Sequence, residues 1–432
     1  MKKSSVVILS VILIVLTVVS TLFVTRMMSE SAPVSPSVSP SDAASISTTA
    51  ETTTTSGKTN DVVIRQSEYD KLKALEEKYA ALEELQDYIL DNYYKEVSPD
   101  LLVEGAKKGV FNILGDPYSV YMNEKEYTSF TESISGEFPG IGVYVAPNPE
   151  MGIEVVSPIE DTPAYNAGIK SADIIKAVNG VEYTDKQMDE AIKHIRGEVG
   201  TNVTITIYRP STKETFDVTI TRAMIVVKVV KSEMLEDGIG YLRLTQFDNH
   251  AYREFKDNLS KLVSQGAKGI VFDLRDNPGG SLDQCLKICD MLLPSGTILS
   301  TKGRAPSTNE VFKSDADYYP GDIVVLINGG SASASEIVAG ALKDNNRALL
   351  VGTKSFGKGI VQTFLPFDRT DGIKLTTSEY FTPSGTNIHG IGITPDFVEE
   401  LSEEFKNTKN PTHAQDNQLQ KALEILKKQM RR

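Results

Sequence analysis

Buried strands alternate with helices in the second half of this 432-residue chain, and that alternation limits the folds open to it. Four short apolar runs predict strands at residues 239–244, 269–274, 323–327 and 348–351. Helical stretches such as residues 252–265 and 335–343 separate them. Apolar strands that alternate with helices are typical of an α/β core. We therefore predict the α/β class for this half of the chain.

A serine, a lysine and a glutamine follow the last two of these strands. Ser333 lies in the run NGGSASASE (residues 328–336), and Lys358 and Gln362 lie in SFGKGIVQ (residues 355–362). A serine hydroxyl is a poor nucleophile at neutral pH and needs a positioned base. A lysine amine can be that base only if burial lowers its pKa from about 10.4 towards the working pH. The small and apolar neighbours suit a buried amine, and Gln362 is placed to orient it by hydrogen bonding.

These motifs resemble those of the carboxy-terminal processing peptidases, or tail-specific proteases, which are Ser-Lys enzymes with a PDZ domain. The matching features are the serine in ASASE, a lysine 25 positions later in FGKG, a glutamine four further on, and FDLRDNPGGSL at residues 272–282. The resemblance covers roughly residues 90–400. It implies a crotonase-like serine protease core with an inserted PDZ domain. It also implies a serine endopeptidase that needs no cofactor and cuts proteins near their C-termini through an acyl-enzyme.

Backbone N–H groups are expected to hold the oxyanion that forms when the serine attacks. Ala334 follows Ser333 at the start of a predicted helix, where free amides and the helix dipole favour negative charge. Gly279 and Gly280 follow the strand at residues 269–274 and have no side chain to block a substrate. We predict an oxyanion hole made by Ala334 with Gly279 or Gly280.

Both catalytic candidates also have simpler interpretations. Ser333, with Glu336 three residues later, has the pattern of a capping box, which is compatible with a nucleophile at a helix N-terminus. Residues 352–359 (GTKSFGKG) match most of a phosphate-binding P-loop. However, Gly359 stands where a P-loop needs a hydroxyl for magnesium, and residues 360–365 predict a strand rather than a helix. A P-loop nucleotide hydrolase is therefore the weaker alternative.

Two further alternatives concern the reaction itself. None of the four histidines has the sequence context of a known Ser-His or Cys-His site, although folding could bring His250 or His389 close to the serine. A catalytically silent PDZ scaffold with a protease fold could bind peptides without cutting them. Such a scaffold would have no reason to keep Ser333, Lys358 and Gln362 together. The sequence therefore favours the endopeptidase.

Residues 136–222 have the pattern of a separate module. Strands are predicted at residues 140–145, 153–156, 173–180 and 202–209, and a helix at about residues 188–196. This order resembles the circularly arranged PDZ domain of bacterial proteases. On that resemblance, a terminal carboxylate is bound by the backbone of Gly140, Ile141, Gly142 and Val143. The resemblance also implies that Arg196 senses an occupied groove and links it to the active site.

The N-terminus predicts a membrane anchor. Residues 6–24 contain no charge, and Lys2 and Lys3 precede them. Nineteen uncharged, mostly apolar residues can span a hydrocarbon core of about 30 Å, and they exceed the apolar region of about 7–15 residues in a typical cleaved signal. The lysines favour a cytoplasmic N-terminus, with the catalytic part outside a cell membrane that the chain crosses once. A cleaved signal peptide is the alternative.

The remaining segments complete the predicted organisation. Residues 29–60 are rich in Ser, Thr and Pro, and residues 69–85 have the apolar spacing of an amphipathic helix that could contact a second copy in a homodimer. The predicted parts are a transmembrane signal-anchor (residues 1–27), a disordered linker (28–62), an N-terminal helical region (63–135), a PDZ domain (136–222), a Ser-Lys protease core (223–400) and a C-terminal helix (401–432).

Composition narrows the partners. The chain has 45 Lys and Arg against 58 Asp and Glu, a formal net charge of −13, which disfavours nucleic acid. Its two cysteines, Cys285 and Cys289, lie four apart in a predicted helix, where the geometry is poor for a disulfide. The sequence supports no metal cluster. The expected partners are proteins or peptides with free C-termini.

Overall fold

The computed structural model describes residues 64–315, 317–408 and 411–431. The predicted transmembrane segment at residues 6–24 and the predicted linker at residues 28–62 lie outside the described residues. Among the helices that the structure describes, none is long and apolar enough to cross a membrane.

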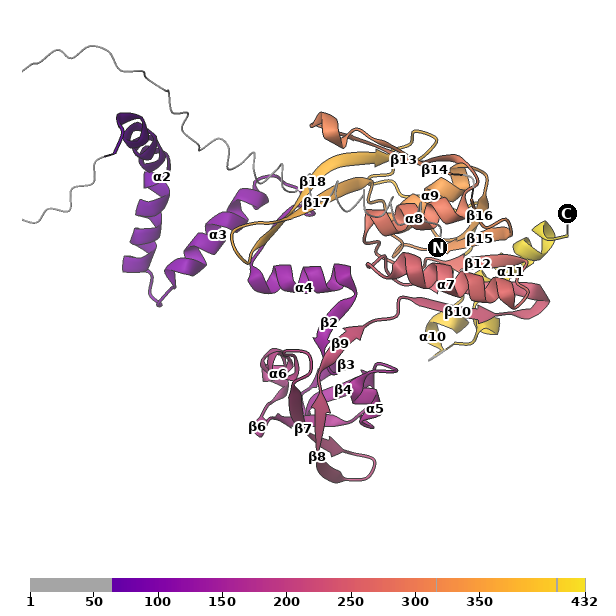
Figure 1. Ribbon diagram of the computed structural model, residues 1–432, viewed down its shortest axis with the longest axis horizontal. Coiled ribbons are helices and arrows are strands. Elements are labelled where there is room, and N and C mark those ends of the chain that lie inside the picture. The colour runs from indigo at the N-terminus through magenta and orange to yellow at the C-terminus, as the bar shows by residue number, and fades with distance from the viewer. Residues whose placement is uncertain (1–63, 316, 409–410, 432) are drawn as a thin grey trace, which may run out of the picture. The chain divides into compact units, whose positions relative to one another are not determined.

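A six-stranded sheet forms the centre of the protease part (Figure 1). In spatial order its strands are β10 (Val230–Met234), β11 (Ile239–Leu244), β12 (Gly269–Asp273), β15 (Asp322–Ile327), β16 (Ala348–Gly352) and β19 (Phe397–Val398). The strands from β11 to β19 are parallel, and β10 pairs antiparallel at one edge. Every residue of β12 is buried, as expected for a parallel strand that is covered on both faces. The four strands predicted from apolar runs are confirmed to within one residue at each end.

Helices cover both faces of this sheet. One face packs against α7 (Ala251–Ser264), α8 (Leu282–Leu292) and α9 (Ala334–Asp344), and the other packs against α11 (Asn417–Gln429). Successive side chains of β12 therefore point to opposite faces of the sheet: Ile270 and Phe272 join the first core, and Val271 joins the second. The C-terminal helix, predicted as a separate terminal part, is therefore a complete layer of the protease core. A shorter helix, α10 (Glu403–Asn407), precedes it.

A second, antiparallel sheet carries part of the candidate site. It consists of β1 (Val120–Met122), β18 (Gly372–Phe381), β13 (Gly296–Gly303) and β14 (Val311–Ser314), with β17 (Ile360–Pro366) paired to β18. Only β17 was predicted. Since β1 lies in this sheet but precedes residues 136–222 in the chain, the module predicted at those residues is inserted into the fold that contains both sheets.

The PDZ domain has a core of its own. The paired strands β2 (Glu137–Gly140) and β9 (Ala223–Val226) lead into and out of it. Its elements are β3 (Val143–Asn148), β4 (Gly152–Pro158), α5 (Pro163–Asn166), β5 (Ile174–Val178), β6 (Val181–Glu182), α6 (Met188–Ile195), β7 (Asn202–Arg209) and β8 (Glu214–Thr221). Side chains from β4, β5, β7 and α6 fill the core, among them Ile153, Ile175, Ile205 and Ile195.

One predicted PDZ strand is wrong in detail. The strand expected over residues 140–145 is broken, because β2 ends at Gly140 and β3 begins at Val143. Gly142 in the break has φ +83°, and a Cβ there would lie 2.4 Å from the Thr162 side chain. A residue with a side chain does not fit this turn.

Three helices precede the PDZ domain. These are α2 (Gln66–Asn92), α3 (Pro99–Asn112) and α4 (Glu124–Ser135). The first contains the amphipathic helix predicted at residues 69–85, and the other two lie within the predicted N-terminal helical region, residues 63–135. A capping box starts α4, since Asn123 and Glu126 each accept a hydrogen bond from the other's backbone N–H. No residue of α2 is buried, and its large apolar side chains face outward.

Candidate active site

Ser333 occupies a strained turn between β15 and α9. It is the N-cap residue of α9 and has φ +52° and ψ −112°, a region that residues with side chains rarely adopt. The two neighbouring serines hold this turn. The Ser331 hydroxyl donates to the Leu274 carbonyl at 2.8 Å, and the Ser335 hydroxyl donates to the Asn277 carbonyl at 2.9 Å. Both hydroxyls are buried, so the serine-rich run fixes Ser333 at the start of the helix.

The Glu336 carboxylate ties the turn of Ser333 to the loop of Lys358. One of its oxygens accepts the N–H of Ser333 at 2.9 Å and the N–H of Lys358 at 2.8 Å. The other accepts the Gly357 N–H at 2.7 Å and the Ser355 hydroxyl at 2.6 Å. Glu336 is fully buried. The sequence identified it as part of a cap, but its larger effect is to fix the backbones of both catalytic candidates against each other.

The Lys358 amine is half-buried and points to Gln362. Lys358 Nζ donates to Gln362 Oε1 at 2.8 Å, and it lies 4.8 Å from the centre of the Tyr118 ring. Burial, together with the positive charge of Lys374, lowers the pKa of Lys358, while Asp116 and Glu336 oppose this effect. Among the described residues, no carboxylate forms an ion pair with the Lys358 amine. These surroundings shift Lys358 towards the neutral amine relative to a lysine in water.

The turn at residues 115–118 is part of the site, which the sequence did not reveal. The Tyr118 carbonyl accepts a hydrogen bond from Gln362 Nε2. This bond fixes the amide so that its oxygen faces Lys358. Asp116 holds the turn by accepting the Tyr118 N–H at 2.9 Å and the Ser119 hydroxyl at 2.6 Å. A carbonyl acceptor leaves no signal in the residue type.

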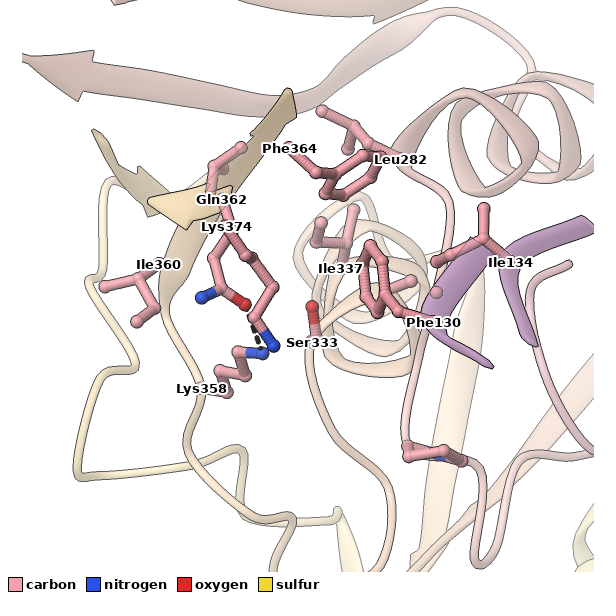
Figure 2. A pocket seen from close by; sticks show the side chains of 14 residues that line it. Phe130, Ile134, Leu282, Ser333, Ile337, Lys358, Ile360, Gln362, Phe364 and Lys374 are labelled. Carbon is pink, nitrogen blue, oxygen red and sulfur yellow. Dashed lines mark hydrogen bonds between the residues drawn. The ribbon is translucent and has the colours of Figure 1, made fainter. Parts of the chain in front are cut away.

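Ser333, Lys358 and Gln362 line one pocket, so the structure brings the three predicted residues together. Their side chains project into the same space, together with that of Lys374 (Figure 2). The walls of the pocket are mainly apolar and include Phe130, Ile134, Leu282, Ile337, Ile360 and Phe364. Such a pocket can receive an apolar side chain of a substrate while it limits water around the lysine.

The structure separates the two predicted oxyanion glycines. The Gly279 N–H donates to Asn277 Oδ1 at 2.9 Å, so this amide is already occupied. Gly280 and Ala334 line the pocket, and within the described residues neither N–H has a backbone or side-chain acceptor. Gly279 has φ +100°, and a Cβ on it would lie 2.9 Å from the Ala334 nitrogen. Of the two predicted alternatives, Gly279 has an N–H that is already bonded, whereas the N–H of Gly280 is available as a donor.

A buried ionic cluster braces the loop that carries these glycines. The Arg275 guanidinium donates to Asp273 at 2.6 Å and to Asp416, the N-cap of α11, at 2.7 Å. Gln418 and Tyr241 complete the cluster by bonding Arg275 and Asp273 respectively. Arg275 therefore joins the end of β12 to the C-terminal helix and lies outside the pocket lining.

The predicted carboxylate loop and Arg196 also share a pocket, in the PDZ domain. Gly140, Ile141, Gly142 and Val143 line this groove with Arg196 and with Ile192 of α6. Arg196 forms an ion pair with Glu132 of α4, and its guanidinium lies 5.1 Å from the centre of the Phe138 ring. Helix α4 also contributes Phe130 and Ile134 to the pocket of Ser333. One helix thus contacts both sites.

The alternative sites do not form. In the part of the chain that the structure describes, no histidine lines the pocket of Ser333. His250 instead contacts Glu137, and the His389 ring lies 6.2 Å from the Tyr118 ring, measured between centres. Residues 360–366 form strand β17, so no helix follows the P-loop-like run as phosphate binding requires.

The class indicated by this fold and site is that of the PDZ-containing serine peptidases. Its features here are the α/β core, the serine at a helix N-terminus with a pocket beside it, and the inserted module. Three family descriptions match the chain: Peptidase family S41 over residues 238–399, PDZ domain over residues 154–209, and Activating protease CtpB N-terminal domain over residues 43–126. The carboxy-terminal-processing protease of Bartonella bacilliformis is 46% identical over 317 residues, which cover 71% of each chain. This chain belongs to that family, the carboxy-terminal-processing proteases of peptidase family S41, and is a serine-type peptidase.

Other proteins are similar to large parts of this chain. A probable CtpA-like serine protease of Staphylococcus aureus is 39% identical over 321 residues, which cover 73% of this chain and 63% of the relative. The solved structure of a photosystem II D1 C-terminal processing protease aligns with 75% of this chain and 88% of that chain, at 24% identity and a TM-score of 0.44.

Proposed function

We propose that this chain is a membrane-anchored endopeptidase in which Ser333 is the nucleophile, Lys358 the base and Gln362 the residue that orients the lysine. The observation that carries the proposal is the 2.8 Å hydrogen bond from Lys358 Nζ to Gln362 Oε1, in the pocket that also contains Ser333. Burial lowers the pKa of Lys358, which supports a neutral amine in the resting enzyme.

Each half of the reaction, acylation and then deacylation, moves one proton to Lys358 and away from it again. Lys358 accepts the proton of the Ser333 hydroxyl while Oγ forms a bond to the scissile carbonyl carbon. The resulting ammonium group then protonates the leaving amine as the C–N bond breaks, which leaves an acyl-enzyme on Ser333. Lys358 then deprotonates a water molecule as the water oxygen bonds to the ester carbonyl carbon, and the ammonium group returns this proton to Ser333 Oγ as the ester C–O bond breaks. Throughout, the Gln362 oxygen accepts a hydrogen bond from the amine, so the nitrogen lone pair is free to face the serine.

The oxyanion would be held by the N–H groups of Ala334 and Gly280. Both residues line the pocket, and Ala334 is the first residue of α9. The helix dipole adds to the stabilisation of negative charge at this position. Gly279 would keep the loop close to Ser333 without donating to the oxyanion, because its N–H donates to Asn277.

Substrate selection would begin in the PDZ groove. The groove formed by residues 140–143 and α6 suits a terminal carboxylate bound by backbone amides, with the peptide paired along a strand edge. Arg196 would respond to the bound tail. Its ion pair with Glu132 would pass the response to α4, whose Phe130 and Ile134 line the catalytic pocket. A tail can shift the enzyme towards activity only if it binds the active state more tightly.

Residues 6–24 and the exposed side of α2 support a proposal for the setting of the enzyme. The uncharged residues 6–24 support a single-pass anchor with the catalytic part outside the cytoplasm. The outward apolar stripe of α2, which includes Tyr69, Leu72, Leu75 and Tyr79, supports a homodimer through this helix. The helix-covered parallel sheet supports the crotonase-like assignment of the core.

Proteolysis of a tailed substrate tests the proposal. The full-length chain is incubated with a protein that has a disordered, apolar C-terminus, and mass spectrometry locates the cut and detects an acyl group on Ser333. We expect cleavage near the C-terminus by the wild-type chain and none by Ser333→Ala. Equal cleavage by Ser333→Ala would refute the nucleophile, and tight tail binding without any cleavage by the wild-type chain would favour the silent scaffold.

A further inference from the structure

Lys374 is a second half-buried lysine in the catalytic pocket, and the proposed reaction does not use it. It lies on β18 opposite Phe364 of β17, and Gln362 lies opposite Thr376 two positions away. Residues two apart on a strand, and residues directly opposite across strands, face the same side of a sheet. Gln362, Phe364 and Lys374 therefore face one side of the β17–β18 pair, and all three line the pocket.

The Lys374 amine is held by an aromatic face. Its Nζ lies 5.4 Å from the centre of the Phe130 ring, and Lys358 Nζ lies 4.8 Å from the centre of the Tyr118 ring, so each amine has a cation–π contact. Asp116 is the carboxylate whose charge acts on Lys374, and Asp116 and Glu336 act on Lys358. Across the described ranges, neither amine has a carboxylate in ion-pair contact. The pocket thus holds two amines without a matching pair of directly bonded carboxylates.

Two ammonium groups in such a pocket repel each other. Burial lowers the pKa of both lysines, and the positive charge of Lys374 lowers that of Lys358 further. The pair therefore releases its first proton at a lower pH than a single lysine would. Reactive lysines in other enzymes are activated by a cationic neighbour in this way.

We propose that Lys374 is a positioning residue for the amine base: its ammonium group, held over the Phe130 ring, keeps Lys358 unprotonated and ready to accept the Ser333 proton. This inference rests on the proposed Ser-Lys function. It assigns to Lys374 no contact with the reacting atoms, only an electrostatic effect on the residue that makes them react.

The pH dependence of kcat/KM for a peptide substrate, measured on the full-length chain, tests the inference. A second readout is the pH dependence of Ser333 acylation by a fluorophosphonate. The variants are Lys374→Met, which removes the charge, and Lys374→Arg, which keeps it permanently. Lys302→Met is the matched control, because Lys302 is an exposed lysine on β13 of the same sheet.

Lys374→Met should move the acid limb of both profiles to higher pH. The rate at neutral pH should fall about tenfold for each unit of the shift and recover towards the wild-type rate in alkali. Lys374→Arg should keep the wild-type limb even if its bulk lowers the rate, and Lys302→Met should reproduce the wild-type profile. Lys374→Gln replaces the Met variant if that variant does not fold.

Three results would overturn the inference. These are an acid limb that stays in place in the Met or Gln variant, a loss of rate that is equal at every pH, and a rise in KM alone, which would mean that Lys374 binds a substrate carboxylate. Each of these leaves the proposed function intact. Cleavage by Lys358→Ala at the wild-type rate would instead refute the proposed function itself.

Discussion

Lys358 and Arg275 are basic residues of the protease core, half-buried and buried respectively, and they differ in whether a carboxylate contacts the basic group. Arg275 contacts two carboxylates, Asp273 and Asp416, at 2.6 and 2.7 Å. Although burial opposes its charge, these partners, Asp273 above all, raise the pKa of the guanidinium. Lys358 instead contacts a neutral amide, and burial lowers its pKa. The paired cation is permanently charged and structural, whereas the cation bonded to an amide can lose its proton and react.

The comparison predicts the largest loss of stability at Arg275. Arg275→Met leaves two buried carboxylates without their partner, so the free energy of unfolding should fall by about 3–5 kcal/mol. Lys287→Met, which breaks an exposed pair with Asp283, is the control and should cost less than about 1 kcal/mol. Chemical denaturation measures both variants, and an Arg275→Met protein as stable as the wild type would contradict the bracing role.

The same cluster predicts how stability depends on pH. Burial of Asp273 opposes its negative charge, but Arg275 outweighs this effect and lowers the pKa of Asp273 in the folded protein. The stabilisation is therefore fully present above the unfolded value of about 3.9 and is lost as the pH falls through the lower folded value. Acid unfolding of the wild-type chain should show this loss, and Arg275→Met should not.

A methyl group on Gly279 should inactivate the enzyme while the fold remains. The new Cβ would lie 2.8 Å from the Ala332 carbonyl and 2.9 Å from the Ala334 nitrogen, so the oxyanion donors must shift. Loss of one such donor lowers kcat by about 100- to 1,000-fold. Gly266→Ala is the matched control, because Gly266 has nearly the same φ, +98°, and open space around it. Equal activity of the two variants would exclude the proposed oxyanion hole.

Giving Lys358 a carboxylate partner should make it resemble Arg275. Gln362→Glu places a negative charge beside the amine, which favours the ammonium form and raises the pKa of Lys358. We expect the acid limb of the kcat/KM profile to move up by one unit or more, with at least about a tenfold loss at neutral pH. Gln362→Leu, which removes the orienting group without adding charge, should lower the rate without this upward shift. Identical limbs in the two variants would show that charge pairing does not control the lysine.

The smallest effect is expected at Arg196, whose ion pair with Glu132 is partly exposed. Arg196→Ala should lower turnover of tailed substrates several-fold at most, consistent with about 1 kcal/mol for such a pair, and leave peptide binding nearly unchanged. Lys193→Ala, an exposed change on the same helix, serves as the control. Val143→Tyr should block the groove and abolish the advantage of a tail. Wild-type rates of Arg196→Ala on tailed and tail-less substrates would refute the gating role.

Much of the site could be predicted because its residue types carry their chemistry. The apolar runs located the strands that lead to Ser333 and Lys358, since strands buried on both faces cannot tolerate polar residues. The antiparallel strands β13, β14 and β18 were missed because they are only partly buried and contain no continuous apolar run. Tyr118 acts through a carbonyl, and Lys374 enters the pocket only through its strand pairing. Neither contact can be read from the residue type alone.

Cleavage by Lys358→Arg is the most direct test of the central claim, that an unpaired lysine is the base. Guanidinium keeps the positive charge and much of the size of the lysine, but it remains protonated at any working pH. The account predicts that the free energy of unfolding of Lys358→Arg equals the wild-type value to within about 1 kcal/mol. It also predicts that Lys358→Arg cleaves as slowly as Ser333→Ala. Robust proteolysis by a folded Lys358→Arg protein would contradict the Ser-Lys mechanism.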